Sequence, residues 1–258
     1  MRITDRLRPA VGASLKHLGL SFAVALLCAG LVFGLWYPYP YSRLIGGREL
    51  FMLVISVDVI SGPLLTLVVF NPRKPRAELW RDLGLVVMLQ LAALGYGLSS
   101  VAQARPVFLA FEGDRFRVVR LPDVDLAELD RAPPALQEFS LRGPQLLGVR
   151  LAKPTDPDFP QSVERSMQGD HPAFRPSRWQ HFEQQRDSVI AVAKPIAALR
   201  KAHPTQQALL DEAVRQAGMD ESRLGWLPLF AGDHTDWVVV VSLSDGVPKA
   251  FLPLDGFQ

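Results

Sequence analysis

Three long apolar segments in the first 104 residues constrain the fold more than any other feature of this chain. They cover residues 18–37, 50–70 and 83–104, and only the second contains a charged residue, Asp58. A helix needs about 20 apolar residues to cross the hydrocarbon core of a bilayer. Amphipathic surface helices are shorter or carry a polar face. The sequence therefore predicts three transmembrane helices.

The first segment has a second interpretation, a cleaved signal peptide, because basic residues precede it. Its apolar region is too long for a signal peptide, and it ends at Trp36 and Tyr37 rather than at small residues. The single cysteine, Cys28, follows a leucine, which does not fit a lipoprotein signal. We therefore expect a retained helix and treat cleavage as the disfavoured alternative.

Basic residues orient the three segments. Four precede the first segment and four lie between the second and third, whereas the loop between the first and second has only Arg43 and Arg48. The positive-inside rule then predicts a cytoplasmic N-terminus and an external C-terminal half. The external end of the first segment carries aromatic residues typical of a membrane interface, namely Trp36, Tyr37, Tyr39 and Tyr41. Prolines and glycines predict that the loop after them, up to residue 47, is tight and non-helical.

The charge balance differs between the two halves of the chain. Residues 1–102 contain ten basic and five acidic residues, and the remainder contains 18 basic and 21 acidic residues. A mildly acidic external half is a poor surface for nucleic acid. The expected cytoplasmic segments are too short to form a core, so we expect no cytoplasmic catalytic or signalling domain.

The predicted fold class is a membrane protein, with a three-helix membrane domain over 1–104 and an external α+β domain over 105–258. Alternation and turn residues predict two strands within 106–121, a strand over 145–152 and a hairpin over 236–254. Helical patterns cover 177–192 and 205–217, and 126–141 is partly helical. The proline-rich segment 153–177 is predicted to be a loop with little regular structure.

Known catalytic and metal-binding patterns are absent from the sequence. It contains no HExxH, CxxC, GxSxG or SxxK motif and no glycine-rich phosphate loop. The favoured interpretation of its five histidines is exposed polar residues, although His171 and His181 could meet a carboxylate through folding. We expect no catalytic residue, no metal and no cofactor, while an enzyme with residues converging from distant positions stays open.

Asp58 is the most informative single residue, because a charge at mid-bilayer costs about 2.5–3.5 kcal/mol on insertion scales. Counting depth from the segment ends places it opposite Tyr96, with Gln90 two turns deeper and reachable if the helices tilt. The neighbouring Gly62-Pro63 pair predicts a kink that frees a backbone carbonyl beside the carboxyl group. Asp58 therefore either holds its own bundle together or meets a partner.

Small residues at helical spacing predict close helix packing. Gly30 and Gly34 form such a pair in the first segment, and Ala93 and Gly97 form one in the third. Two interpretations stay open. These faces pack against each other inside the bundle, or one of them receives a helix from another protein.

Several motifs together resemble the type IV pilin accessory proteins of the TfpX/TfpZ type. They are "WYPYP" (36–40), "GG" (46–47), "VDVISGPLLTLVVF" (57–70), Lys74 with Leu79, Asp82 and Leu83, Gln90 with "ALGYGL" (93–98), "ARPV" (104–107) and "FEGDRFRVV" (111–119). The resemblance is dense over about residues 33–120, and "DWVVVV" (236–241) is its main later part. It implies a Gram-negative inner-membrane protein with a periplasmic C-terminal domain that modulates pilus assembly or surface piliation, and it carries over no catalytic residue.

The preferred hypothesis is therefore an accessory protein that binds type IV pilin or the pilus assembly platform in a lipid bilayer. The expected partners include no nucleic acid. The alternatives are a membrane-anchored periplasmic enzyme acting on envelope or pilin substrates and, less favoured for want of cytoplasmic structure, an envelope sensor.

Overall fold

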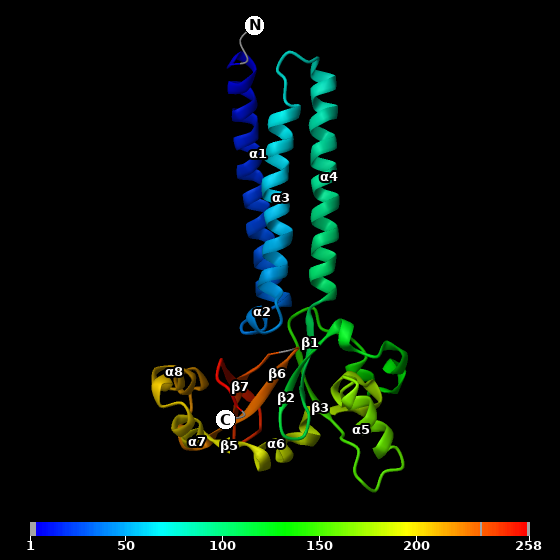
Figure 1. Ribbon diagram of the computed structural model, residues 1–258, viewed down its shortest axis with the longest axis vertical. Coiled ribbons are helices and arrows are strands. Elements are labelled where there is room, and N and C mark those ends of the chain that lie inside the picture. Colours follow the sequence, from blue (N-terminus) through cyan, green and yellow to red (C-terminus); the bar gives the residue numbers. More distant parts are fainter. Residues whose placement is uncertain (1–3, 233, 257–258) are drawn as a thin grey trace. The chain divides into compact units, whose positions relative to one another are not determined.

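The computed structural model of the protein describes residues 4–232 and 234–256 (Figure 1). The chain divides into two compact units, Met1–Arg105 and Pro106–Gln258. The first is called the helical unit below, and the second is called the sheet unit.

Long helices form the helical unit. They are α1 (Thr4–Leu31), continued by a π-helical turn η1 (Val32–Trp36), α3 (Gly47–Val69) and α4 (Arg76–Gln103). Three helical segments of the described residues are long and apolar enough to cross a membrane, namely Leu7–Trp36, Gly47–Val69 and Arg76–Gln103. Helix α4 begins before its apolar stretch because Pro75 precedes it and Glu78 lies in its first turn. Lys74 supports this start through ion pairs with Glu78 and Asp82.

Helix α3 lies between α1 and α4 and packs against both (Figure 1). The apolar core at the end of the bundle near α2 (Tyr41–Leu44) includes Val32, Phe51 and Val101. The Tyr37 hydroxyl donates a hydrogen bond to the Val101 carbonyl oxygen at 2.9 Å. The prediction of a wholly non-helical loop after the first segment is wrong, because α2 forms one helical turn there. Pro40 is the residue just before this turn, with φ −94°.

The described part of the sheet unit forms an eight-stranded mixed sheet in the order β4-β3-β1-β2-β6-β7-β8, with β5 paired to β6. The strands are β1 (Pro106–Phe111), β2 (Phe116–Arg120), β3 (Gln145–Val149), β4 (Trp179–His181), β5 (Lys194–Pro195), β6 (Leu224–Ala231), β7 (His234–Ser242) and β8 (Pro248–Leu252). The pairs β1–β3 and β2–β6 are parallel, and the others are antiparallel.

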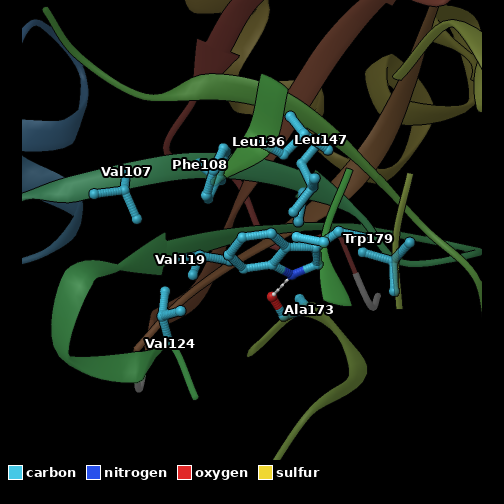
Figure 2. Close-up of a cluster of buried hydrophobic side chains, with 11 residues drawn as sticks. Val107, Phe108, Val119, Val124, Leu136, Leu147, Ala173 and Trp179 are labelled. Carbon is cyan, nitrogen blue, oxygen red and sulfur yellow. Dashed lines mark hydrogen bonds between the residues drawn. The ribbon is translucent and has the colours of Figure 1, made fainter. Parts of the chain in front are cut away.

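Two apolar clusters cover the sheet, one at each side of the β2–β6 pairing. In the first, Phe108 contacts the Trp179 ring, with 4.7 Å between centroids, and the Trp179 indole donates to the Ala173 carbonyl oxygen at 2.9 Å (Figure 2). In the second, Trp226 and Leu210 pack among residues of β6, β7, β8 and α8. Only two residue pairs, beginning with Phe116 and Leu229, join β2 to β6. The sheet unit therefore contains two halves with separate cores.

The remaining helices are short. The α-helices are α5 (Phe159–Met167), α6 (Arg186–Val192), α7 (Ile196–Ala202) and α8 (Gln207–Ala217). The 3-10 turns are η2 (Leu121–Asp123), η3 (Leu126–Arg131), η4 (Pro134–Leu136), η5 (Pro172–Phe174), η6 (Pro176–Arg178), η7 (Phe182–Gln185), η8 (Pro204–Gln206) and η9 (Glu221–Arg223).

The predicted strands of 106–121, 145–152 and 236–254 are present, and so is the helix predicted over 205–217, which ends at Gly218 with φ 64°. The prediction for 153–177 is wrong, because α5 lies inside it and Pro160 occupies its first turn, where a missing N–H group costs nothing. The helix predicted over 177–192 is only partly correct. Residues 179–181 form β4, because Trp179 pairs with Val149 of β3, and the α-helix covers only Arg186–Val192. Strand β6 was not predicted.

Candidate functional site

Asp58 and Gln90 form the centre of the candidate site in the helical unit. Asp58 on α3 is 7% exposed and Gln90 on α4 is 8% exposed. The Gln90 side-chain amide donates to the Asp58 backbone carbonyl oxygen at 3.1 Å and lies 3.5 Å from the carboxyl oxygen Oδ1. The 3.5 Å contact is at the limit of a hydrogen bond, so the carboxyl group is weakly satisfied by this partner.

The expected position of Tyr96 opposite Asp58 is wrong. Tyr96 is 80% exposed, whereas Gln90 and Gly97 are buried on the face of α4 that contacts α3. Depth along a helix can be counted from the sequence, but the face on which a residue lies follows the 3.6-residue period. Gln90 shares the period of the buried residues, and Tyr96 does not.

Gly62 allows the Gln90 amide to approach α3. A Cβ atom at position 62 would lie 2.1 Å from the Gln90 amide nitrogen, so any larger residue would displace that side chain. Pro63 lies inside α3, and its carbonyl oxygen accepts a hydrogen bond from the Ser14 hydroxyl at 2.8 Å. The glycine and proline thus belong to one polar contact region together with Asp58.

Helix α1 adds three polar residues that the sequence analysis did not assign to this site, namely Ser14, His17 and Ser21. His17 Nδ1 lies 2.5 Å from the Thr66 hydroxyl of α3. The spacing of i, i+3 and i+7 places all three on one face of α1, which is the signal that would have found them.

A pocket of about 70 Å³ lies among α1, α3 and α4, and its lining includes His17, Ser21, Asp58 and Gln90. The Gln90 carbonyl oxygen Oε1 is buried and has no hydrogen-bond partner among the described residues. The volume is sufficient for water molecules between these polar groups. The pocket can therefore present a buried carboxyl and an unused acceptor to water or to a donor from a partner.

The two predicted small-residue pairs have different surroundings. A Cβ atom at Gly97 would lie 2.3 Å from the Val54 side chain, so α4 approaches α3 closely at this glycine. Ala93 is exposed. A Cβ atom at Gly30 or at Gly34 would have no described atom within 4 Å, the nearby backbone of its own helix left aside. Gly97 therefore serves packing within the bundle, whereas Gly30 and Gly34 do not.

The histidines of the sheet unit do not form a metal centre in the described part of the chain, where no group of three or more His, Cys, Asp or Glu side chains could hold an ion. The His171 ring packs edge-on against Phe174, and His203 Nε2 lies 2.9 Å from the Asp255 carbonyl oxygen. Burial and the positive charge of Arg117 lower the pKa of His171.

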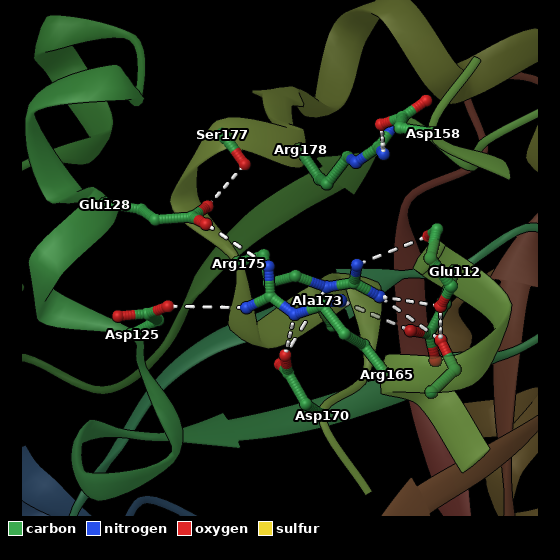
Figure 3. Close-up of polar contacts among 12 residues, drawn as sticks. Glu112, Asp125, Glu128, Asp158, Arg165, Asp170, Ala173, Arg175, Ser177 and Arg178 are labelled. Atoms are coloured by element: carbon green, nitrogen blue, oxygen red, sulfur yellow. Dashed lines mark hydrogen bonds and ion pairs between the residues drawn. The ribbon is translucent and has the colours of Figure 1, made fainter. Parts of the chain in front are cut away.

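The sheet unit contains a charged network that sequence reasoning did not predict (Figure 3). Arg117 Nε donates to the Glu112 carboxylate at 2.8 Å, and the Ala173 backbone N–H donates to its other oxygen at 3.2 Å. Arg165 of α5 bonds to three carboxylates, which belong to Asp125, Glu128 and Asp170. Asp125 and Glu128 lie 40 and 37 residues before Arg165, and Ala173 lies 61 residues after Glu112, so only the fold brings these partners together.

Glu128 illustrates the effect of this network on protonation. Burial alone would raise its pKa, but the donors Ser177 and Arg165 outweigh burial and hold the pKa of Glu128 below its usual value. The network therefore keeps this carboxyl ionised, which favours a structural or ion-binding role over an acid role.

Comparisons with known proteins find similarity to fimbrial assembly proteins. The family model "Fimbrial assembly protein FimB" matches residues 5–46. The chain is 35% identical over 243 residues to the fimbrial assembly proteins of serogroups E1 and I of Dichelobacter nodosus, covering 94% of this chain and 94% of each relative. It is 43% identical over 116 residues to the fimbrial assembly protein of serogroups C1 and C2, which is 45% of this chain and 88% of that protein. No solved structure matches at a significant level.

Proposed function

Because the chain belongs to the family of fimbrial assembly proteins, we propose that it is an inner-membrane accessory protein that modulates the assembly or surface display of type IV pili. The observation that carries this proposal is similarity along nearly the whole chain, through both units, to proteins named for fimbrial assembly. A role in fimbrial assembly agrees with the sequence-based resemblance. The TfpX/TfpZ type and the link to type IV pilin are the finer parts of the proposal.

The proposed location is a multi-pass position in the inner membrane. Three helical segments of the described chain have the length and apolar composition for this. The distribution of basic residues supports a cytoplasmic N-terminus and a periplasmic sheet unit. In this arrangement the helical unit meets the membrane helix of a pilin and the sheet unit meets its globular head or the assembly platform.

Two features of the helical unit support helix binding. The Asp58 pocket offers a buried carboxyl and an unused carbonyl acceptor at the junction of three helices. The face of α1 and η1 at Gly30 and Gly34 has no described atom packed against these two glycines, so a helix of another protein could approach it closely. We propose that pilin binds at one or both of these features and that the protein acts on pilin through this binding rather than through catalysis.

Site-specific photo-crosslinking tests the binding step. A photoreactive residue at Gly30 or Gly34 is expected to capture pilin in membranes, and one at Met88, which is 60% exposed on α4, serves as the matched control. A further probe in the sheet unit at Met167, which is 84% exposed, tests for contact with the pilin head. Capture at none of these positions, or equal capture at all of them including Met88, would contradict specific binding.

Deletion of the gene tests the cellular role. Surface pili are expected to decrease, and counting them in strains with and without a retraction defect separates two steps. Recovery of pili in the retraction-deficient strain places the protein in the balance between assembly and retraction. Continued absence indicates an essential assembly role, and unchanged pili in both strains would refute the proposal.

A further inference from the structure

A polar pocket of about 280 Å³ lies beside α5 in the sheet unit, and arginines dominate its lining. They come from η3, β3, α5 and η6 and the segments next to them, and they are Arg131, Arg150, Arg165, Arg175 and Arg178. Two carboxylates, Glu128 and Asp158, also line it. The further carboxylates of the network lie outside the lining and pair with Arg165 and Arg150. The lining itself therefore holds five arginines and two carboxylates, and the three carboxylates behind it balance the remaining positive charge.

Arg175 is the most deeply buried of these arginines, at 2% exposed. Its terminal nitrogens donate only to neutral oxygens, those of Ser162 and Ser166. Its Nε group is buried and has no hydrogen-bond partner in the described part of the chain, and Asp170 Oδ1 lies 3.8 Å away. A buried guanidinium group normally has a carboxylate partner with good hydrogen-bond geometry. Arg175 lacks such a partner within the network.

Arg178 shows the same incomplete pairing. It is 5% exposed, and its Nη2 group pairs with Asp158, whereas Nη1 is buried without a partner among the residues described. Two buried arginines of one pocket wall thus each keep one nitrogen whose N–H groups have no described partner. An unused buried donor is costly, so its persistence calls for an explanation.

The charge surroundings of Arg175 agree with the unused donors. Burial lowers the pKa of its guanidinium group, the Asp170 carboxylate opposes this, and the neighbouring charges of Arg165 and Arg178 lower the pKa further. An anion in the pocket would reverse this effect and stabilise the charged form.

We propose that this pocket binds an oxyanion, a phosphate or a carboxylate group, which accepts hydrogen bonds from Arg175 and Arg178. The planar guanidinium group suits both kinds of anion, because its parallel N–H groups match paired oxygens. The volume lies below the usual range for a whole small-molecule ligand, so a single anionic group with its water fits it. This site does not depend on the proposed role in pilus assembly.

Calorimetric titration of the full chain in detergent tests the site. The probes are inorganic phosphate and a hexaglutamate peptide, with sodium chloride at matched ionic strength and a hexaglutamine peptide as controls. Wild-type protein is expected to bind phosphate, the acidic peptide or both, and neither control. Binding of phosphate alone indicates a free anion as ligand, and binding of the acidic peptide alone indicates a carboxylate of a partner.

Variants locate the binding. Arg178→Gln removes a buried donor and is expected to abolish binding. Because that variant can also fail to fold, Arg131→Gln, at an exposed arginine of the wall, provides a second test with an expected loss of affinity of about tenfold, or about 1.4 kcal/mol. Arg200→Gln removes an arginine of the sheet unit that pairs with Asp211 and Glu221 outside the pocket, and it should keep wild-type affinity. Wild-type protein that binds no probe, or an Arg131→Gln/Arg150→Gln variant with unchanged affinity, would overturn the proposal.

Discussion

Each unit of this protein contains one carboxyl group buried to the same extent, and the two groups have very different partners. Glu112 in the sheet unit and Asp58 in the helical unit are both 7% exposed. Glu112 accepts from a guanidinium group and from a backbone N–H, at 2.8 and 3.2 Å. Asp58 has an amide contact to its carboxyl oxygen at 3.5 Å and lies beside a small pocket.

Glu112 thus has its hydrogen-bonding capacity met inside its own unit, whereas Asp58 can still accept a hydrogen bond from a partner. Burial imposes a desolvation cost on both carboxyl groups, and only Glu112 has partners that offset it well. The same contrast recurs among the glycines. The Val54 side chain occupies the space beside Gly97, whereas no described atom occupies the space beside Gly30.

The largest effect is expected from Arg117→Met, which leaves the Glu112 charge buried without its ion-pair partner. Breaking a buried pair in this way destabilises a protein by about 3–5 kcal/mol. Urea unfolding of the full chain in detergent, followed by tryptophan fluorescence, measures the loss, because Trp179 lies in the adjacent core.

The double variant Glu112→Gln/Arg117→Met is the control. It also removes the unpaired Glu112 charge, so it should recover most of the free energy of unfolding that the single variant loses. A single variant that is as stable as wild type would show that Glu112 finds another partner and that the contrast with Asp58 is weaker than the distances suggest.

The second prediction compares Gly97→Leu with Gly30→Leu. The first substitution forces a side chain into Val54 and is expected to destabilise the bundle by about 1–3 kcal/mol, as overpacking does. The second meets no described atom and should leave the amount of membrane protein unchanged. Immunoblots of membrane fractions and thermal unfolding in detergent measure both. Equal losses of stability in the two variants would contradict the distinction between Gly97, which is packed against α3, and Gly30, which is not packed within the bundle.

Much of the fold could be predicted because the relevant signals are local. The apolar segments, the turn at Gly113 and the hairpin of β7 and β8 depend on runs of residue types that neighbours in sequence establish. Helix α5 and strand β6 were missed for a shared reason. Both contain proline, Pro160 and Pro228, which argues against regular structure unless its position in the element is known.

The candidate site was predictable only in part, because a site depends on which face each residue occupies. Asp58, Gly62 and Pro63 stood out as polar or helix-breaking residues in an apolar run. Choosing Gln90 over Tyr96 needed the rotation of α4 about its axis, which a depth counted from the segment ends does not fix. The arginine network joins positions from 112 to 178, and no short motif encodes that convergence.

The third prediction concerns Asp58→Asn, which removes the charge and keeps the size and most of the hydrogen-bonding capacity. Since Asp58 contributes little to satisfying its own bundle, stability is expected to change by less than about 1 kcal/mol. Surface pili are expected to be lost if the carboxyl serves a partner. Pilus counts and immunoblots are measured on the same cells, with Ser56→Ala on an exposed part of α3 as the control. Loss of the protein itself would instead assign Asp58 to the bundle.

The smallest effect is expected from pH acting through His171, which lies beside the fully paired Glu112 and Arg117. Burial and the Arg117 charge lower the pKa of His171, while the charges of Glu112 and Asp170 oppose this. The unfolded chain, in which histidine has its ordinary pKa of about 6.5, then binds more protons than the folded chain at mildly acidic pH. The contribution of His171 to stability is therefore fully present above about pH 6.5 and decreases as the pH falls through the lowered pKa. Urea unfolding at several pH values should show this slope in wild-type protein and a flatter one in His171→Gln. An identical slope in both proteins would mean that the charges around the buried pair do not act on this histidine.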